Sequence, residues 1–321
     1  MAAVQVGIAL PVRETAILGY PDAGPLMKMA QQVEELGFDS VWVGDSFVAR
    51  HRLEPLTLLA AIAMLTNRVT IGTAALTAVL RDPLYLSHIL VTLDQLAGDR
   101  LRIALGTGFP LPAKEELDAV TTTYGQRAGR MDEAVEFWKR HWSGRDGDFV
   151  GKYVDLSELV NQSPPTTPGG PRIWLASNGK PRAVARAGAQ YDGWLPVRIE
   201  PDEYRKSLRA IRDTAEAAGR DPGDIEPALY VTVNISDDPA EALAGLEDYT
   251  DRYNNMPIEP LRAYQLYYGG SAADFTDWLA EYVEAGARHI VLRMGSFDHY
   301  ERNVRAIADG VMPGLHAMKV D

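Results

Sequence analysis

The sequence predicts a closed (β/α)8 TIM barrel with loop insertions, formed by the whole chain, residues 1–321, as a single domain. Three observations support this fold class. Eight short apolar runs alternate with amphipathic helical segments, as expected for parallel strands covered by helices. Four of these runs follow a glycine that could end the preceding helix. The length of 321 residues suits one α/β barrel as well as it suits two smaller domains.

The eight runs are short and rich in branched and aromatic residues, which is typical of strands buried on both faces of a parallel sheet. They are Gln5–Leu10, Ser40–Val43, Thr70–Ala74, Arg102–Leu105, Arg172–Ala176, Gly193–Pro196, Ala228–Asn234 and His289–Arg293. The helix-ending glycines, each predicted to be left-handed, are Gly37, Gly98, Gly188 and Gly286. A doubly wound open sheet is the main alternative, but no Gly-x-Gly-x-x-Gly loop follows the first run.

Apolar residues at three- and four-residue spacing predict helices between the strands. These segments begin near Pro25, Pro83, Arg130, Pro181, Pro201 and Phe275.

Three further stretches are insertions that a minimal (β/α)8 barrel does not need. Leu111–Gln126 follows the fourth strand, so we expect it at the end of the barrel where active sites lie. Ser143–Gly170 precedes the fifth strand and is expected at the opposite end unless it folds back, and Asp237–Tyr268 is expected to be helical in its first half.

Composition excludes several classes of partner. Asp plus Glu number 44 and Lys plus Arg 32, so the formal net charge is −12, which repels a nucleic-acid backbone. No apolar run reaches the roughly 18 residues of a membrane helix, and the first residues lack the basic start of a signal peptide. We therefore expect a cytoplasmic protein without a membrane partner. The absence of cysteine excludes disulfides and thiolate chemistry.

Polar residues that directly follow the strands form the candidate active site, because barrel enzymes work at the C-terminal ends of their strands. Several are arginines although the chain is acidic, which indicates an anionic ligand; pairing with surface carboxylates is the alternative. Arg50, His51, Arg198 and Arg293 are the candidates for substrate contact or catalysis. The six histidines have no metal-ligand spacing, so no metal site is predicted.

The segment after the fifth predicted strand predicts an anion site. Ser177, Asn178 and Gly179 lie just before a helix that begins at Pro181. The free N–H groups and the dipole at a helix start favour an anion, and a phosphate is the natural ligand. The alternative is a helix start capped by Ser177 or Asn178 with nothing bound. After the fourth strand, a glycine-rich turn either admits a flat ligand or simply turns the chain.

Several runs, in order and over nearly the whole chain, resemble the bacterial luciferase-like monooxygenase superfamily. They are Glu34–Asp45, Glu54–Ala61, Thr66–Thr73, Leu93–Leu101, Leu105–Gly108, Arg127–Ala134 and Asp192–Pro196. The resemblance implies a (β/α)8 barrel that binds reduced FMN, or the deazaflavin coenzyme F420, at the C-terminal ends of its strands. It also implies a non-proline cis peptide at the end of the third strand, beneath the cofactor ring.

The resemblance also implies which residues bind the cofactor. They are Ala74, Ala75, Gly106, Thr107, Tyr124, Arg127, Ser177, Asn178 and Gly179. The first two lie where the cis peptide is expected, and the last three match the phosphate site. Deazaflavin-dependent sugar-phosphate dehydrogenases of this superfamily carry a His and a Glu at the positions of Ser46 and Phe109, so the acid/base pair of that branch is missing here.

The main functional prediction is a monooxygenase that uses reduced FMN and oxygen on a small organic substrate and receives the flavin from a separate flavin reductase. Phe47, Phe109 and Phe297 could form an apolar wall that keeps water out. An F420-dependent reductase or dehydrogenase is the first alternative. A non-catalytic flavin-binding relative and an unrelated barrel enzyme acting on a phosphorylated metabolite are the others. A homodimer is expected because relatives often form dimers.

Overall fold

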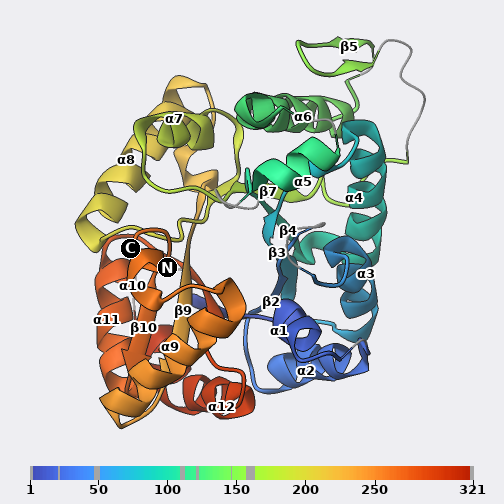
Figure 1. Ribbon diagram of the computed structural model, residues 1–321. Helices are drawn as coiled ribbons and strands as arrows, with labels where there is room; N and C mark the ends of the chain where they lie inside the picture. The colour runs from blue at the N-terminus through green and yellow to red at the C-terminus, as the bar shows by residue number, and fades with distance from the viewer. Residues whose placement is uncertain are drawn as a thin grey trace.

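The computed structural model describes residues 3–20, 22–46, 51–108, 113–120, 123–145, 147–156 and 163–318. Eight parallel strands close into a barrel, which confirms the predicted fold class (Figure 1). The strands are β1 (Gln5–Ala9), β2 (Ser40–Val43), β3 (Thr70–Leu76), β4 (Leu101–Leu105), β7 (Arg172–Leu175), β8 (Gly193–Trp194), β9 (Glu226–Ile235) and β11 (His289–Met294). The barrel closes because β1 pairs with both β2 and β11, while β9 pairs with both β8 and β11.

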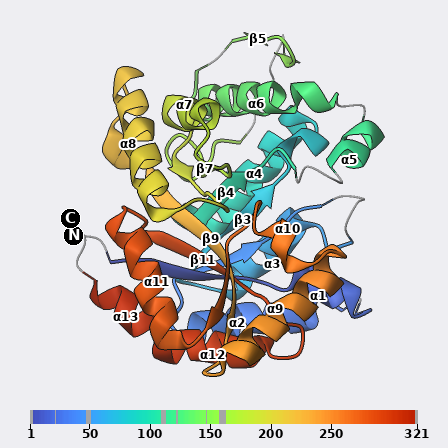
Figure 2. The ribbon, with the colours of Figure 1, turned by 60° about the vertical axis from the view of Figure 1, so that its left-hand side comes forward.

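Helices surround the strands on all sides (Figure 2). They are α1 (Val12–Ile17), α2 (Gly24–Glu35), α3 (Pro55–Leu65), α4 (Pro83–Ala97), α5 (Ala113–Ala119), α6 (Arg127–Trp142), α7 (Pro181–Gln190), α8 (Pro201–Ala217), α9 (Pro239–Asn254), α10 (Ile258–Leu261), α11 (Ala272–Glu284), α12 (Tyr300–Gly310) and α13 (Met312–Ala317). Several begin with a proline, whose missing N–H costs nothing in the first turn of a helix. Within the described ranges, no helix is both long and apolar enough to cross a membrane.

Two small pairings were not predicted. A short antiparallel hairpin joins β5 (Phe149–Val150) to β6 (Asp155–Leu156) and projects beyond α6 in Figure 1. A further strand, β10 (Tyr267–Gly270), pairs with the last four residues of β9. The predicted helix in the first half of the third insertion is confirmed as α9.

The insertion before β7 reaches both ends of the barrel. The amides of Tyr153 and Val154 donate to Glu133 Oε1 near the start of α6, at 2.5 Å each. Further along, the Thr167 amide and hydroxyl donate to Asp94 near the end of α4, at 2.9 and 2.7 Å. The first part of this insertion therefore folds back, which is the alternative that the sequence analysis left open, because the Glu133 carboxylate holds it against the first half of α6.

One of the four glycines was assigned the wrong role. Gly37, Gly98 and Gly286 have φ angles of 90°, 63° and 115°, as predicted for helix ends. Gly188 instead lies inside α7. A Cβ atom there would lie 2.4 Å from the backbone oxygen of Ile211, so the glycine allows α7 and α8 to pack closely.

Large side chains fill the inside of the barrel near the N-terminal ends of its strands. The rings of Trp42 and Trp174 lie 5.1 Å apart, and that of His289 lies 5.3 Å from each. Ser40 Oγ accepts from Trp42 Nε1 at 2.7 Å and lies 2.6 Å from His289 Nε2. Trp174 Nε1 donates to Glu226 at 2.6 Å. This layer fills the barrel interior near the N-terminal ends of its strands.

Acidification is expected to destabilise the protein through His289. Burial, and then the charge of Arg102, lowers its pKa from 6.5 to about 3. The folded state therefore keeps the imidazole neutral while the unfolded chain takes up a proton. Between these pH values the free energy of unfolding should fall by up to about 1.4 kcal/mol per pH unit, with no contribution above the window.

Urea denaturation as a function of pH measures this contribution. His289→Asn should give a shallower dependence of the unfolding free energy on pH than the wild type, whatever its absolute stability. Parallel slopes for the two proteins would show that His289 does not contribute to the acid sensitivity.

Candidate functional site

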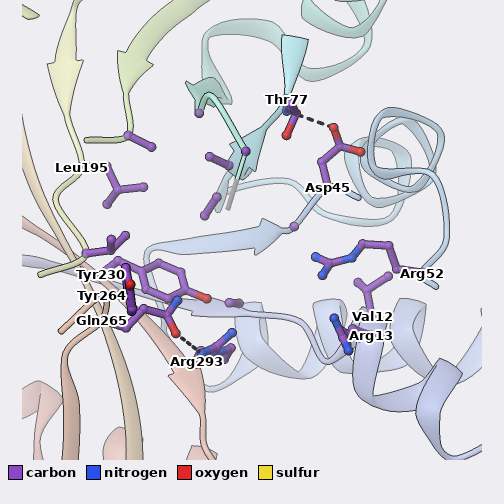
Figure 3. A pocket seen from close by; sticks show the side chains of 18 of the residues that line it. Val12, Arg13, Asp45, Arg52, Thr77, Leu195, Tyr230, Tyr264, Gln265 and Arg293 are labelled. Carbon is purple, nitrogen blue, oxygen red and sulfur yellow. Dashed lines mark hydrogen bonds between the residues drawn. The ribbon is translucent and has the colours of Figure 1, made fainter. Parts of the chain in front are cut away.

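A cavity of about 340 Å³ opens at the C-terminal ends of the barrel strands. All eight strands or the residues that follow them contribute to its lining, and α9 and the segment before β10 complete it. Figure 3 shows Arg13 and Arg52 on one side of the space and Tyr230, Gln265 and Arg293 on another. This is the end of the barrel at which the sequence predicts the active site.

The residues predicted to support a cofactor ring form a wall of small side chains. Ala74, Ala75, Gly106 and Thr107 all line the cavity. The peptide bond between Ala74 and Ala75 is cis, as the resemblance implies. A Cβ atom on Gly106 would lie 3.3 Å from Ala75 Cβ, so a larger residue there would crowd the wall. A flat ring could therefore lie against β3 and β4.

The predicted phosphate site follows β7 and also opens to the cavity through Ser177 and Asn178. Ser177 Oγ is buried and has no hydrogen-bond partner. Among the described residues, the backbone N–H groups of Ser177, Asn178 and Gly179 have no acceptor either. Helix α7 has Lys180 as its N-cap and no side-chain cap, so the capping alternative is absent. The donors are free for an anion, as a phosphate requires.

Three other predicted cofactor residues lie outside the cavity lining. A Cβ atom on Gly179 would lie 2.4 Å from Ser207 Oγ, so Gly179 packs against α8 and can offer only its backbone. Arg127 donates to the Tyr124 carbonyl at 2.6 Å, and its guanidinium lies 3.6 Å from the centre of the Tyr124 ring. The part of Tyr124 and Arg127 in phosphate binding stays a prediction.

Of the three predicted catalytic residues, only Arg293 lines the cavity. His51 is exposed in the segment before α3. Arg198 pairs with Glu200 at 2.6 Å and donates to the Arg262 carbonyl at 2.8 Å. The structure therefore does not bring His51 and Arg198 together with Arg293, and their catalytic roles stay predictions.

Some sequence expectations concern residues outside the described ranges, namely Phe47, Arg50 and Phe109. Phe297 is described, but it packs 5.3 Å from the ring of Tyr249 rather than on the cavity. Ser46 donates to the buried Glu116 at 2.6 Å. Glu116, on α5, thus contacts Ser46, the position at which the resemblance implies a histidine in the sugar-phosphate dehydrogenase branch. No local sequence pattern indicates this pairing.

Three arginines surround one tyrosine of the cavity, Tyr253. The guanidinium carbons of Arg13 and Arg293 lie 4.6 and 4.7 Å from the centre of its ring. Arg52 Nη2 lies 3.4 Å from its hydroxyl. The sequence analysis missed Tyr253 because it belongs to α9, within an insertion. Arg13 and Arg52 follow β1 and β2, and Arg293 lies near the end of β11. These three strands are neighbours in the sheet, and β2 pairs with β3 of the wall.

Arg293 is only 8% exposed and remains a cation. It donates to Thr232 Oγ1 at 2.8 and 3.1 Å and to Gln265 Oε1 at 3.0 Å, which are neutral acceptors. Burial alone would lower its pKa, but Tyr249 and then Tyr230 and other tyrosines raise it well above the usual value. Within the described chain, no carboxylate forms an ion pair with Arg293. The cavity therefore carries a buried positive charge.

Each of the two carboxylates that line the cavity accepts hydrogen bonds from other side chains of the protein. Asp45 accepts from Arg81 at 2.7 and 3.1 Å and from the Thr77 amide at 3.0 Å. Glu14 accepts from the hydroxyl of Tyr249. The described residues contain no group of three or more His, Asp or Glu that could hold a metal ion. The positive charge of Arg293 is therefore not neutralised by either carboxylate of the cavity.

The sequence matches a family model described as luciferase-like monooxygenase over residues 4–296. The F420-dependent glucose-6-phosphate dehydrogenase of Kineococcus radiotolerans is 34% identical over 231 residues, which span 68% of this chain and 66% of that protein, just under two thirds of its length. Its counterpart in Mycolicibacterium gilvum is 26% identical over 85% of this chain and 88% of that protein. The phthiodiolone/phenolphthiodiolone dimycocerosates ketoreductase of Mycobacterium tuberculosis is 29% identical, over 65% and 61%.

Solved structures share the fold. An F420-dependent secondary alcohol dehydrogenase, in complex with an F420–acetone adduct, superposes with a TM-score of 0.81 at 19% identity, over 98% of this chain and 99% of that one. The monooxygenase RslO1 from Streptomyces bottropensis has a TM-score of 0.77 at 23% identity, over 96% and 99%. At these identities the similarity concerns the fold alone.

Replacing Ser177 with alanine should weaken the binding of a phosphate-bearing cofactor. A hydrogen bond to a charged group contributes about 1.5–3 kcal/mol, so we expect roughly 10- to 100-fold lower affinity for F420 or FMN in a fluorescence titration. The stability of the cofactor-free protein should not fall, because the hydroxyl has no partner there.

Ser143→Ala is the matched control, because that hydroxyl donates to the Arg140 carbonyl at 2.8 Å on the exposed end of α6. It should keep the wild-type affinity. Equal affinities of wild type and Ser177→Ala would place the phosphate elsewhere.

Proposed function

Since the chain belongs to the luciferase-like monooxygenase family, we propose that it is an F420-dependent oxidoreductase that interconverts an alcohol and a carbonyl compound. The observation that carries the proposal is the 34% identity to an F420-dependent dehydrogenase. A ketoreductase is among the other relatives. A dehydrogenase and a ketoreductase perform the same exchange of hydrogen at an oxygen-bearing carbon, in opposite directions.

We therefore favour the F420-dependent reductase or dehydrogenase, the first alternative from the sequence, over the main prediction of an FMN-dependent monooxygenase. The monooxygenase RslO1 is similar at only 23% identity, which supports the fold and not the cofactor. A flavin reductase partner would be needed only if FMN were the cofactor. The homodimer stays a prediction.

The site residues fit a deazaflavin nucleotide. The free amides around Ser177 and the orphaned Ser177 hydroxyl would hold its phosphate, and the wall at Ala74, Ala75 and Gly106 would receive its ring. When bound, F420 supplies a ring that accepts or donates a hydride and reacts poorly with oxygen.

This chain's own side chains would orient the substrate. Arg52, which follows β2, and Arg293, on β11, both line the cavity. Their N–H donors can stabilise negative charge that develops on a substrate oxygen, a contribution that is large in a site from which water is excluded. The side chains of Leu195 and Val197 add apolar lining beside Ala74, Ala75 and Ala176. The geometry therefore favours a substrate whose reacting oxygen lies toward the arginines.

Cofactor titration followed by turnover tests the proposal. The purified protein should bind F420 more tightly than FMN. With oxidised F420 and a panel of secondary alcohols and sugar phosphates, it should bleach the cofactor absorbance without oxygen. Tight binding of FMN alone, together with oxygen consumption in the presence of a flavin reductase, would refute it and restore the monooxygenase.

A further inference from the structure

We infer that Tyr253 is the catalytic residue that exchanges a proton with the substrate oxygen during hydride transfer. The inference rests on the proposed function, because it assigns a role within that reaction. Ser46 and Phe109 stand at the positions where the resemblance implies a His and a Glu in one deazaflavin-dependent branch. The proposal therefore assigns the proton to another group of the cavity.

The position of Tyr253 suits this role. It lines the cavity from α9 and is only 5% exposed. Arg13 and Arg293 approach its ring, and Arg52 approaches its hydroxyl at 3.4 Å. A substrate oxygen placed near Arg52 would therefore also lie near the tyrosine hydroxyl, as proton transfer requires.

Four other groups of the cavity could exchange a proton, and each is less suited. Tyr264 is 43% exposed, so it is not held in the protein interior as Tyr253 is. The carboxylate of Asp45 is held by Arg81, and that of Glu14 accepts from Tyr249. Tyr230 lines the cavity too, but burial raises its pKa to about 12, although Arg293 opposes the shift. A phenol with so high a pKa is a poor base near neutral pH.

The charges around Tyr253 act in the opposite direction. Burial by itself would raise its pKa, and Glu14 on α1 adds to that effect. The charges of Arg52, Arg293 and Arg13 outweigh both, so the pKa of Tyr253 is lowered from 10.0. Its stacked neighbour Tyr249, whose ring lies 5.1 Å away, has a pKa raised well above 10.0 by burial and then by Glu14, against Arg293.

The step balances with F420 as the oxidant. In the direction of alcohol oxidation, the carbinol C–H bond breaks and its hydride, with two electrons, passes to the oxidised deazaflavin ring. The hydroxyl O–H bond breaks and its proton passes to the Tyr253 phenolate, and the carbon–oxygen double bond forms. Ketone reduction is the reverse, with the Tyr253 phenol as the donor. Arg52 stabilises the charge on either oxygen.

An optical pH titration of the cofactor-free protein tests the charge state without any turnover. Among the 14 tyrosines, one should ionise at lower pH than free tyrosine, as seen by tyrosinate absorbance. This early step should vanish in Tyr253→Phe, move to higher pH in Arg52→Met and remain in Tyr249→Phe, the matched control. An early step that persists in Tyr253→Phe would overturn the inference.

Kinetics of the F420-loaded enzyme then test the role. In Tyr253→Phe the kcat for alcohol oxidation should fall roughly 10²- to 10⁴-fold, the usual contribution of acid–base catalysis, with little change in KM. The rising limb of the wild-type pH profile should disappear in Tyr253→Phe and persist in Tyr249→Phe. A Tyr253→Phe enzyme that keeps this limb would overturn the inference, whereas a wild type that oxidises no alcohol with F420 would overturn the proposed function.

Discussion

The buried positive charge of Arg293 is the constraint on which the site depends. A cation in a protein interior loses several kcal/mol of hydration. Among the described residues, Arg293 donates side-chain hydrogen bonds only to the neutral acceptors Thr232 and Gln265. The surrounding tyrosine rings compensate in part, since their faces attract cations. The remaining imbalance favours negative charge nearby, whether on the Tyr253 oxygen or on a substrate oxygen. In the proposed reaction, substrate binding and proton transfer would both depend on this one electrostatic arrangement.

The residues that line the cavity come from two groups of neighbouring strands. β3, β4 and β7 provide the small-residue wall and the free amides, while β11, β1 and β2 lead to the three arginines. The layer of Trp42, Trp174 and His289 fills the barrel interior near the N-terminal ends of the strands. A ring held against the first group would therefore share the cavity with the cations of the second group.

The barrel and the segment from Ser177 to Pro181 could be predicted from local signals, namely apolar runs and prolines at helix starts, whereas Ala74 and Ala75 came from the family resemblance. Arg293 was also predicted, but its partner Tyr253 was not. Tyr253 lies 201 residues from Arg52, so no spacing along the chain relates them. The role of Gly188 was misjudged for a similar reason, since the requirement for glycine there comes from α8.

Isotope transfer tests the central claim most directly. A secondary alcohol with deuterium on its carbinol carbon should be incubated with the protein and oxidised F420, and the reduced cofactor analysed by mass spectrometry. Direct hydride exchange predicts one carbon-bound deuterium on the deazaflavin ring from the alcohol, and none there when the deuterium is supplied only by the solvent. An unlabelled ring, or an oxygen atom from labelled O₂ in the product, would contradict the account.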